Sequence, residues 1–301
     1  MTQHKILLLG SSGQLGLSIK ELLEKKYTLR EINRPELVFE DSEDLKQRVL
    51  AFNPKIIINS SAYTSVDLAE NERIEAEIAN SLGPSLLAEI SKELGSLLIH
   101  YSTDYVFDGQ KNTAYKETDE CNPINFYGKS KRDGEKAILE SNCKSLIIRT
   151  SWVYSHLRNN FLLTILKLAT SKNEIKVIDD QYGSPTSTEQ IALATFNLLE
   201  NYLRGNLNDL GLYHFSSIGK TSWYGFAKEI VDQAEKLDFN LTLRKENIEP
   251  IKSEEYGAIA ERPKNSFLDI TKILSVIDIN VSKWQVELVQ VLKKIKKLTY
   301  E

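Results

Sequence analysis

The stretch that decides the fold lies near the N-terminus and reads Ile6-Leu-Leu-Leu-Gly10-Ser-Ser-Gly13-Gln-Leu-Gly16. Its apolar residues predict a short buried strand, and the spacing of residues 15–26 predicts a helix after the glycines. Glycines at such a turn let the backbone approach a pyrophosphate at the helix N-terminus. An ordinary strand-to-helix turn is the alternative, but the position after the first strand favours dinucleotide binding. The residues expected at that site are Gly10, Ser12, Gly13, Gln14, Leu15 and Gly16.

Strand-like and helix-like segments alternate through the first half of the chain. Apolar runs occur at residues 5–9, 55–59, 97–101 and 145–149, and weaker runs occur at 27–32 and 175–178. Helical spacing occurs at 15–26, 42–52 and 72–94, and Gly83-Pro84 predicts a kink or boundary in the last stretch. Short apolar strands separated by helices are typical of a parallel sheet that is covered on both faces. We therefore expect an α/β fold, a Rossmann-type doubly wound parallel sheet.

The alternation loosens after about residue 150, where tryptophan and tyrosine become frequent and the loops lengthen. We expect residues 1–152 to form the dinucleotide-binding domain, which would also receive residues 175–205. Residues 153–301 would form most of a smaller C-terminal α+β domain that binds the substrate. The segment 283–298 has one apolar helical face with lysines around its last turns, which predicts a C-terminal helix.

Composition excludes several classes of protein. The chain has 301 residues, of which 41% are hydrophobic, so it can bury a core and is neither disordered nor collagen-like. Its 38 basic and 42 acidic residues give a net charge of −4, which argues against a nucleic-acid partner. The first apolar run is too short for an export signal or a membrane span, and the two cysteines fit free thiols. We expect a cytoplasmic protein with no membrane partner.

A tyrosine and a lysine four residues apart, Tyr127 and Lys131, share one helix face. The pair is common by chance, but Thr103 and Asp104 stand upstream at the end of an apolar strand, where open α/β sheets bind ligands. A hydroxyl, a phenol and an ammonium that converge there would form a proton-transfer unit. We expect the charge of Lys131 to lower the pKa of Tyr127 toward the range useful for general acid catalysis.

The second predicted strand ends near Ile32 and is followed by Asn33 and Arg34. A carboxylate at this place would bind a ribose 2′-hydroxyl, whereas an arginine can bind a 2′-phosphate. Arg34 therefore favours NADPH over NADH, with a solvated surface arginine as the alternative. Metal catalysis has little support, because the four histidines are far apart in the sequence and no cysteine pair accompanies them. No Walker-type or G-x-S-x-G motif is present either.

Together these features resemble the extended short-chain dehydrogenase/reductases, and further blocks resemble the dTDP-4-dehydrorhamnose reductase family within them. The blocks follow one another from the first strand to Arg262. They are Pro54-Lys-Ile-Ile-Ile-Asn59-Ser-Ser-Ala62-Tyr-Thr-Ser-Val-Asp67-Leu-Ala-Glu70, Tyr101-Ser-Thr-Asp-Tyr-Val-Phe-Asp108-Gly109, Asn122-Pro123-Ile-Asn-Phe-Tyr-Gly-Lys-Ser-Lys131, Arg149-Thr-Ser-Trp-Val-Tyr154, Asp180-Gln-Tyr-Gly-Ser-Pro-Thr186 and Arg262-Pro263.

The resemblance implies that NADPH or NADH reduces the carbon-4 ketone of dTDP-4-dehydro-β-L-rhamnose to give dTDP-L-rhamnose. By matching position, Tyr127 would donate the proton and Lys131 would hold the nicotinamide ribose. Thr103 would hydrogen-bond the sugar ketone, and Asp104 would contact the sugar or adjust the pKa of Tyr127. Trp152 would contact the sugar nucleotide. The loop after the third strand would contact the cofactor through Ser61, Ala62 and Tyr63.

The chain also departs from the family pattern. An aspartate and an apolar residue usually face the adenine after the second strand, whereas the best match here is Val38-Phe39, so Phe39 is the expected contact. Some members carry a glutamate two residues after the third glycine, linked to a magnesium-bridged dimer. Ser18 occupies that position, so neither the metal nor that dimer is implied. A monomer or a homodimer remains open.

Two other functions fit parts of the same pattern. Another nucleotide-sugar 4-ketoreductase or epimerase would use the same tyrosine and lysine. A non-catalytic protein similar to the regulatory subunit of methionine adenosyltransferase would use the same fold for binding alone. The intact Tyr127, Lys131 and Thr103 argue against the second alternative.

Overall fold

A six-stranded parallel sheet forms the centre of the molecule in the computed structural model, which describes residues 4–300. The strand order is β10-β5-β4-β3-β1-β2. From β1 the chain adds β2 on one side of the sheet and then crosses to the other side of β1 to add β3, β4 and β5. The carboxyl ends of β1 and β3 therefore flank the point where doubly wound sheets bind ligands. The strand bounds are β1 Lys5–Leu9, β2 Thr28–Ile32, β3 Ile56–Asn59, β4 Leu97–Thr103, β5 Lys144–Thr150 and β10 Gly211–His214.

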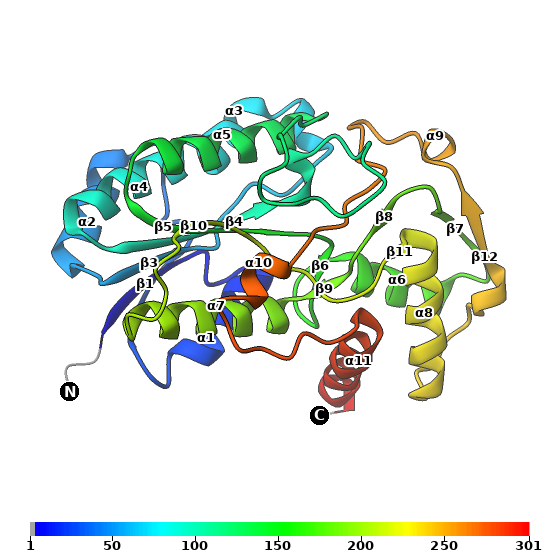
Figure 1. Cartoon of the computed structure of the whole chain (residues 1–301). Coiled ribbons are helices and arrows are strands. Elements are labelled where there is room, and N and C mark those ends of the chain that lie inside the picture. Colours follow the sequence, from blue (N-terminus) through cyan, green and yellow to red (C-terminus); the bar gives the residue numbers. More distant parts are fainter. Residues whose placement is uncertain (1–3, 301) are drawn as a thin grey trace.

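Two layers of helices cover the sheet, because its central strands are apolar on both faces (Figure 1). One face packs against α1 (Gln14–Leu23) and α7 (Thr188–Leu203). The other face packs against α2 (Ser42–Phe52), α4 (Gly83–Leu94) and α5 (Phe126–Glu140). The Rossmann-type α/β fold expected from the sequence is confirmed.

The helical stretch after β3 is divided into three parts. It consists of α3 (Arg73–Glu77), the π-helical turn η2 (Ile78–Leu82) and α4, so a boundary does occur at Gly83, as the sequence predicts. The turn directs the buried Asn80 toward the loop after β3, where its amide bonds both the N–H and the carbonyl of Tyr63. Asn80 also donates to the Ser130 hydroxyl on α5 at 3.0 Å. The turn therefore ties the loop after β3 to α5.

A second apolar cluster lies beside the main sheet and is built from α6 (Phe161–Ser171), α8 (Trp223–Lys236) and α11 (Trp284–Tyr300). A two-stranded parallel ladder, β7 (Ile175–Ile178) with β12 (Ile248–Ile251), packs with them. The helix predicted for residues 283–298 is present as α11. The division of the chain into two domains stays a prediction, although α7 and β10 return to the main sheet and its helices.

Short elements connect these layers. They are β6 Val153–Tyr154, β8 Tyr182–Gly183, β9 Thr186–Ser187, β11 Thr221–Ser222, α9 Ser253–Tyr256, α10 Thr271–Leu274 and the 3-10 turns η1 Leu68–Glu70, η3 Asp104–Val106 and η4 Lys245–Asn247. Within residues 4–300, no helix combines the length and the apolar character needed to cross a bilayer.

The sixth strand of the main sheet differs from the sequence expectation. The apolar run at 175–178 pairs with β12, outside the main sheet, and β10 takes the edge position beside β5. The short segment Gly211-Leu-Tyr-His214 carries too weak an apolar pattern to be recognised as a strand. Its place is decided by tertiary packing, since the buried Tyr213 and Phe215 join the core under the sheet.

The close seat of α5 on η2 gives a test of the fold. A Cβ on Gly134 would lie 2.1 Å from the carbonyl oxygen of Asn80, so Gly134→Ala must push the helix outward. We expect the substitution to lower the free energy of unfolding by about 1–3 kcal/mol in urea denaturation. The matched control is Lys136→Ala on the exposed side of α5, which should change it by less than about 0.5 kcal/mol. Wild-type stability of Gly134→Ala would contradict the close contact.

Candidate functional site

A cavity of about 1000 Å³ lies at the carboxyl ends of the strands, beside β1, β2 and β3. The glycine loop, the end of β2 and the loop after β3 line it. Eight residues predicted for the cofactor meet there, namely Gly10, Ser12, Gly13, Arg34, Phe39, Ser61, Ala62 and Tyr63. Its size and position suit a dinucleotide.

Two of the loop glycines are required by sterics. Gly10 has a φ of +76°, and a Cβ there would lie 2.6 Å from the backbone nitrogen of Ser61. At Gly16 a Cβ would lie 2.1 Å from the carbonyl oxygen of Gly10. The loop therefore folds tightly against both the helix start and the loop after β3. This leaves the backbone of the loop open to the cavity.

Gln14 and Leu15, which were also predicted to bind the cofactor, do not line the cavity and instead support the loop. Leu15 packs with the core below the sheet, and the side-chain oxygen of Gln14 accepts a hydrogen bond from Ser155 at 3.3 Å. Arg158 extends from the same segment and donates from Nε to the carbonyl oxygen of Ser12 at 2.9 Å. Residues 155–158 thus brace the glycine loop from the second half of the chain, a contact with no local sequence signal.

The end of β2 presents an amide and an arginine to the cavity. Asn33 accepts from the Ser12 N–H at 2.9 Å and donates to the Ser11 hydroxyl at 2.7 Å. The nearby carboxylate of Glu31 is held by Lys20 at 2.8 Å and by the Ser11 hydroxyl. No ion pair to Arg34 occurs among residues 4–300, so its guanidinium is available to an anion in the cavity it lines.

The helix that carries Tyr127 and Lys131 begins at a well-defined cap. The side chain of Asn125 accepts from the N–H of Gly128 at 2.8 Å, as an N-cap residue does. A Cβ on Gly128 would lie 2.1 Å from the carbonyl oxygen of Tyr105, so the first turn of α5 is seated on η3. This contact brings Tyr127 to Thr103 and Asp104, and the ring of Tyr105 meets that of Tyr127 edge-on at 5.7 Å.

The phenol of Tyr127 is held in its neutral form. Burial raises the pKa of Tyr127 to about 12, the negative charge of Asp104 adds to the rise, and a hydrogen bond with Thr103 opposes it. The expectation that Lys131 lowers this pKa is wrong for the structure. Lys131 instead directs its Nζ to the carbonyl oxygen of Tyr101 at 2.6 Å and to Nε2 of His100 at 3.3 Å.

Burial destabilises the charged form of Lys131, because only 2% of the residue is exposed. Burial lowers the pKa of Lys131 to about 8, and the negative charge of Glu135 one turn along α5 limits the fall. Glu135 is in turn paired with the buried Arg149 of β5 at 2.6 Å. The site thus contains a lysine whose charge depends on pH near neutrality.

The carboxyl of Asp104 has an incomplete set of partners. The residue is 2% exposed; one oxygen accepts from the Thr103 hydroxyl at 3.1 Å, and Oδ2 has no hydrogen-bond partner among the described residues. Burial raises the pKa of Asp104 to about 7, with Ser266 and Thr103 opposing the rise. An unpaired buried oxygen beside a phenol is typical of a functional site, because it is costly unless a ligand uses it.

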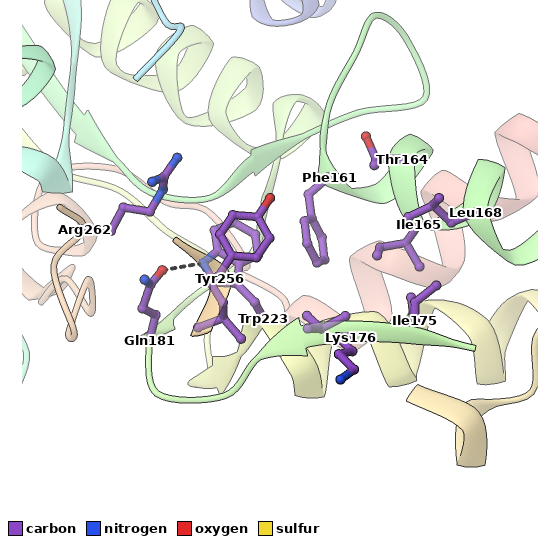
Figure 2. A pocket seen from close by; sticks show the side chains of 12 residues that line it. Phe161, Thr164, Ile165, Leu168, Ile175, Lys176, Gln181, Trp223, Tyr256 and Arg262 are labelled. Carbon is purple, nitrogen blue, oxygen red and sulfur yellow. Dashed lines mark hydrogen bonds between the residues drawn. The ribbon is translucent and has the colours of Figure 1, made fainter. Parts of the chain in front are cut away.

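A second cavity of about 290 Å³ lies between α6, β7 and the start of α8 (Figure 2). Its walls are mainly apolar and include Phe161, Ile165 and Trp223. Polar groups stand at one end, where Gln181 accepts from Trp223 Nε1 at 3.2 Å and Arg262 projects beside Tyr256. Trp223 both forms a wall of this cavity and donates to Gln181, and no local sequence signal points to this placement.

Trp152 lies behind this cavity and does not line it. The residue has a φ of +49°, is 8% exposed, and stacks on Trp223 with 3.5 Å between ring centroids. Its expected contact with a sugar nucleotide stays a prediction. In this structure the ring of Trp152 supports Trp223 from behind.

The described part of the chain contains no group of three or more histidine, cysteine, aspartate or glutamate side chains able to hold a metal ion. His100 and His214 are fully buried on β4 and β10. His214 contacts Arg149 and the carbonyl oxygen of Tyr115, as a structural histidine does. His100, in contrast, contacts Lys131.

The raised pKa of Asp104 predicts a pH-dependent effect on stability. Between about pH 4 and about pH 7 the folded state keeps a proton that the unfolded state has lost, so burial of Asp104 destabilises the fold increasingly as pH rises. Asp104→Asn removes this cost. In urea denaturation, the free energy of unfolding of the variant minus that of wild type should rise by about 2 kcal/mol between about pH 5 and about pH 8.

The control for this measurement is Asp108→Asn. The Gln110 N–H and other hydrogen bonds lower the pKa of Asp108, so its stabilisation is complete above about pH 4 and is lost only in more acidic solution. The difference between Asp108→Asn and wild type should therefore stay constant over the same interval. An equally constant difference for Asp104→Asn would show that Asp104 ionises normally.

Comparison with known proteins supports one family over almost the whole chain. The family model described as RmlD substrate binding domain matches residues 4–297. The dTDP-4-dehydrorhamnose reductase of Aggregatibacter actinomycetemcomitans is 39% identical over 93% of this chain and 96% of its own length. The enzyme of the same name from Escherichia coli K12 is 37% identical over 96% of this chain and 97% of its own length.

A solved structure agrees with these relatives. The crystal structure of dTDP-4-dehydrorhamnose reductase from Bacillus anthracis in complex with NADP has a TM-score of 0.88 and 33% identity, and the match covers 97% of this chain and 100% of that one. The resemblance inferred from the motifs is confirmed. This chain belongs to the RmlD substrate-binding-domain family, the family of the dTDP-4-dehydrorhamnose reductases.

Proposed function

We propose that this protein reduces the carbon-4 ketone of dTDP-4-dehydro-β-L-rhamnose to give dTDP-L-rhamnose, with NADPH as the reductant. The observation that carries the proposal is the meeting of Tyr127, Thr103 and Asp104 at the end of β4 in a chain of this family. These three residues place a proton donor, a hydroxyl and an incompletely bonded carboxyl together. A ketone oxygen needs such groups when it becomes a hydroxyl.

The large cavity fits the cofactor. Backbone groups of Gly10, Ser12 and Gly13 at the start of α1 suit the pyrophosphate. Arg34 suits a 2′-phosphate, since Glu31 is neutralised by Lys20 and Asn33 carries no charge. Phe39 offers a ring for the adenine. When bound, NADPH supplies the hydride that reduces the ketone.

The chain supplies the proton and the hydrogen bonds. Tyr127 would donate its phenolic proton to the ketone oxygen, while the hydroxyl of Thr103 would turn from Asp104 to donate to that oxygen. Asp104 would bind a sugar hydroxyl through its free Oδ2 and, when ionised, would keep Tyr127 protonated until transfer. Lys131 would hold the nicotinamide ribose. In its charged form it would donate hydrogen bonds from Nζ to the ribose hydroxyls.

The second cavity fits the nucleotide part of the substrate. Phe161 and Trp223 offer apolar faces for a base, and Gln181 offers an amide. Arg262 at the polar end suits a diphosphate, and Asp67 after β3 holds it by two hydrogen bonds of 3.1 and 2.6 Å. Trp152 would act by fixing Trp223. A cytoplasmic monomer or homodimer is part of the same proposal.

The direct test is a panel of nucleotide-linked 4-keto sugars, with the loss of NADPH or NADH absorbance at 340 nm as the readout. The dTDP-linked 4-keto-6-deoxy sugar should be reduced fastest, and NADPH should be preferred. Faster reduction of another nucleotide sugar would assign a different ketoreductase. Absence of cofactor oxidation with every sugar would favour a binding role similar to that of a regulatory subunit.

Removal of the phenolic proton tests the role of Tyr127. Tyr127→Phe keeps the ring, so we expect NADPH binding to remain within about twofold while kcat falls by about 10²–10⁴-fold. The matched control is Tyr213→Phe, which removes a phenol that bonds the carbonyl oxygen of Asp209 away from the site. Wild-type turnover in Tyr127→Phe would remove it as the acid.

Removal of the guanidinium tests the role of Arg34. If Arg34 binds the 2′-phosphate, Arg34→Ala should weaken NADPH binding by about 10-fold or more and leave NADH almost unchanged. Arg48→Ala serves as the control, because Arg48 is already paired with Asp44 on α2 at 2.7 Å. Titration of protein fluorescence with each cofactor measures both constants. Equal losses for NADPH and NADH would exclude a phosphate contact.

A further inference from the structure

A buried row of polar side chains leads from the loop after β3 to Lys131. Asn59 ends β3, His100 lies beside it on β4, and Lys131 reaches them from α5. The Asn59 amide nitrogen is 3.2 Å from Nδ1 of His100, and Nε2 of His100 is 3.3 Å from Nζ of Lys131. All three residues are at most 2% exposed, so bulk water does not reach them.

The orientation of the Asn59 amide is fixed by Ser61. The backbone N–H of Ser61 points to Oδ1 of Asn59 at 3.1 Å, and the Ser61 hydroxyl reaches the same oxygen at 2.5 Å. A backbone N–H can only donate, so the atom that faces it must be the amide oxygen. The NH₂ group of Asn59 therefore faces His100 and donates to Nδ1.

A neutral imidazole has one lone pair and one N–H. Burial and the charge of Lys131 hold the pKa of His100 well below its usual range, so the ring is neutral. Because Nδ1 accepts from Asn59, the proton of His100 is on Nε2, and this N–H faces Lys131. A charged ammonium has only donors and would meet it donor to donor. A neutral amine has a lone pair that accepts it, while its own N–H donates to the Tyr101 carbonyl.

We propose that His100 is a positioning residue which, held in one tautomer by Asn59, presents Nε2–H to Lys131 and thereby favours the neutral amine. Each residue in this row donates a hydrogen bond to the next. Ser61 donates to Asn59, Asn59 donates to His100, and His100 donates to the lone pair on Nζ of Lys131. The imidazole thus opposes the charged form of a lysine whose pKa burial already lowers to about 8.

The other titratable groups around Lys131 do not reproduce this effect. Glu135 on the same helix favours the charged form, and Arg149 on β5 largely neutralises Glu135. Tyr127, one turn earlier on α5, and Asp104 on η3 are both held toward their neutral forms by burial. Among the described side chains, His100 is the polar group in direct contact with Nζ, so its tautomer decides how that contact counts.

The test follows the ionisation of Lys131 directly. In protein labelled with ¹³C-lysine, the Cε signal that disappears in Lys131→Arg belongs to Lys131, and it is followed from about pH 6 to about pH 10. In His100→Gln the side-chain oxygen can accept from a charged ammonium, so the midpoint should rise by about one pH unit or more. The matched control is His214→Gln, which removes the other fully buried histidine.

A second variant reverses the row of bonds without removing the imidazole. In Asn59→Asp the carboxylate still accepts from Ser61 and now also accepts from Nδ1–H of His100. The lone pair of Nε2 then faces Lys131 and accepts from its ammonium. The midpoint should again rise, and the new negative charge contributes to that rise. The ¹⁵N shifts of the His100 ring in wild type, which report whether Nδ1 or Nε2 carries the proton, therefore decide the matter if His100→Gln does not fold. Unchanged midpoints in the folded variants, or an equal rise in His214→Gln, would overturn the proposal.

The consequence for catalysis rests on the proposed function. If charged Lys131 is the form that binds the nicotinamide ribose, kcat should fall as pH rises through the Lys131 midpoint, and in His100→Gln this alkaline limb should move upward with it. The NMR titration needs no substrate, so it stands even if the sugar is misassigned. A shifted NMR midpoint without reductase activity would refute the function alone. An unshifted midpoint in an active enzyme would refute the role of His100 alone.

Discussion

The close seat of α5 on its neighbours is the constraint on which the rest of the site depends. Gly128 and Gly134 stand where a side chain would collide with the backbone oxygens of Tyr105 and Asn80, each 2.1 Å from the position of a Cβ. The missing side chains let the helix approach η3 at one end and η2 at the other. Tyr127 is thereby brought to Thr103, and the long side chain of Lys131 reaches the backbone of β4. A helix held even slightly farther away would separate these groups.

This arrangement has an energetic cost that the frame must offset. Lys131 and Asp104 are buried with few partners, and Oδ2 of Asp104 has none within residues 4–300. Such groups destabilise a folded protein unless a ligand completes their bonds. The stabilisation comes from the apolar side chains of the central strands, which are buried on both faces of the sheet. The Glu135–Arg149 pair is joined by two hydrogen bonds.

Much of the fold could be predicted from the sequence because its strongest signals are local. The apolar runs of β1, β3, β4 and β5 and the loop Gly10–Gly16 identify a doubly wound sheet and the place of its ligand. The edge strand β10 could not be recognised, because four residues of weak pattern are placed by packing alone. The contact of Arg158 with the glycine loop joins residues 146 positions apart and leaves no pattern in either segment.

In the candidate site too, the identity of the functional residues could be predicted from motifs, whereas their chemical environment could not. Motifs identified Tyr127, Lys131, Thr103 and Asp104, and the structure brings the phenol, the hydroxyl and the carboxyl together. Their ionisation could not be predicted, since the sequence suggests that Lys131 acts on Tyr127, whereas burial dominates both residues. The role of His100 is equally invisible in the sequence, because it depends on which way the Asn59 amide faces.

The three pKa shifts at this site share burial as their largest cause. The pKa of Tyr127 rises to about 12, that of Asp104 rises to about 7 and that of Lys131 falls to about 8, so burial favours the uncharged form of each group. A site whose own groups are mostly uncharged exerts only a weak electrostatic field on a bound substrate. Charge that develops on a substrate oxygen there interacts with a few placed donors. A net charge of −4 is compatible with two pyrophosphate ligands, because the backbone of the glycine loop and Arg262 would hold them without a basic surface.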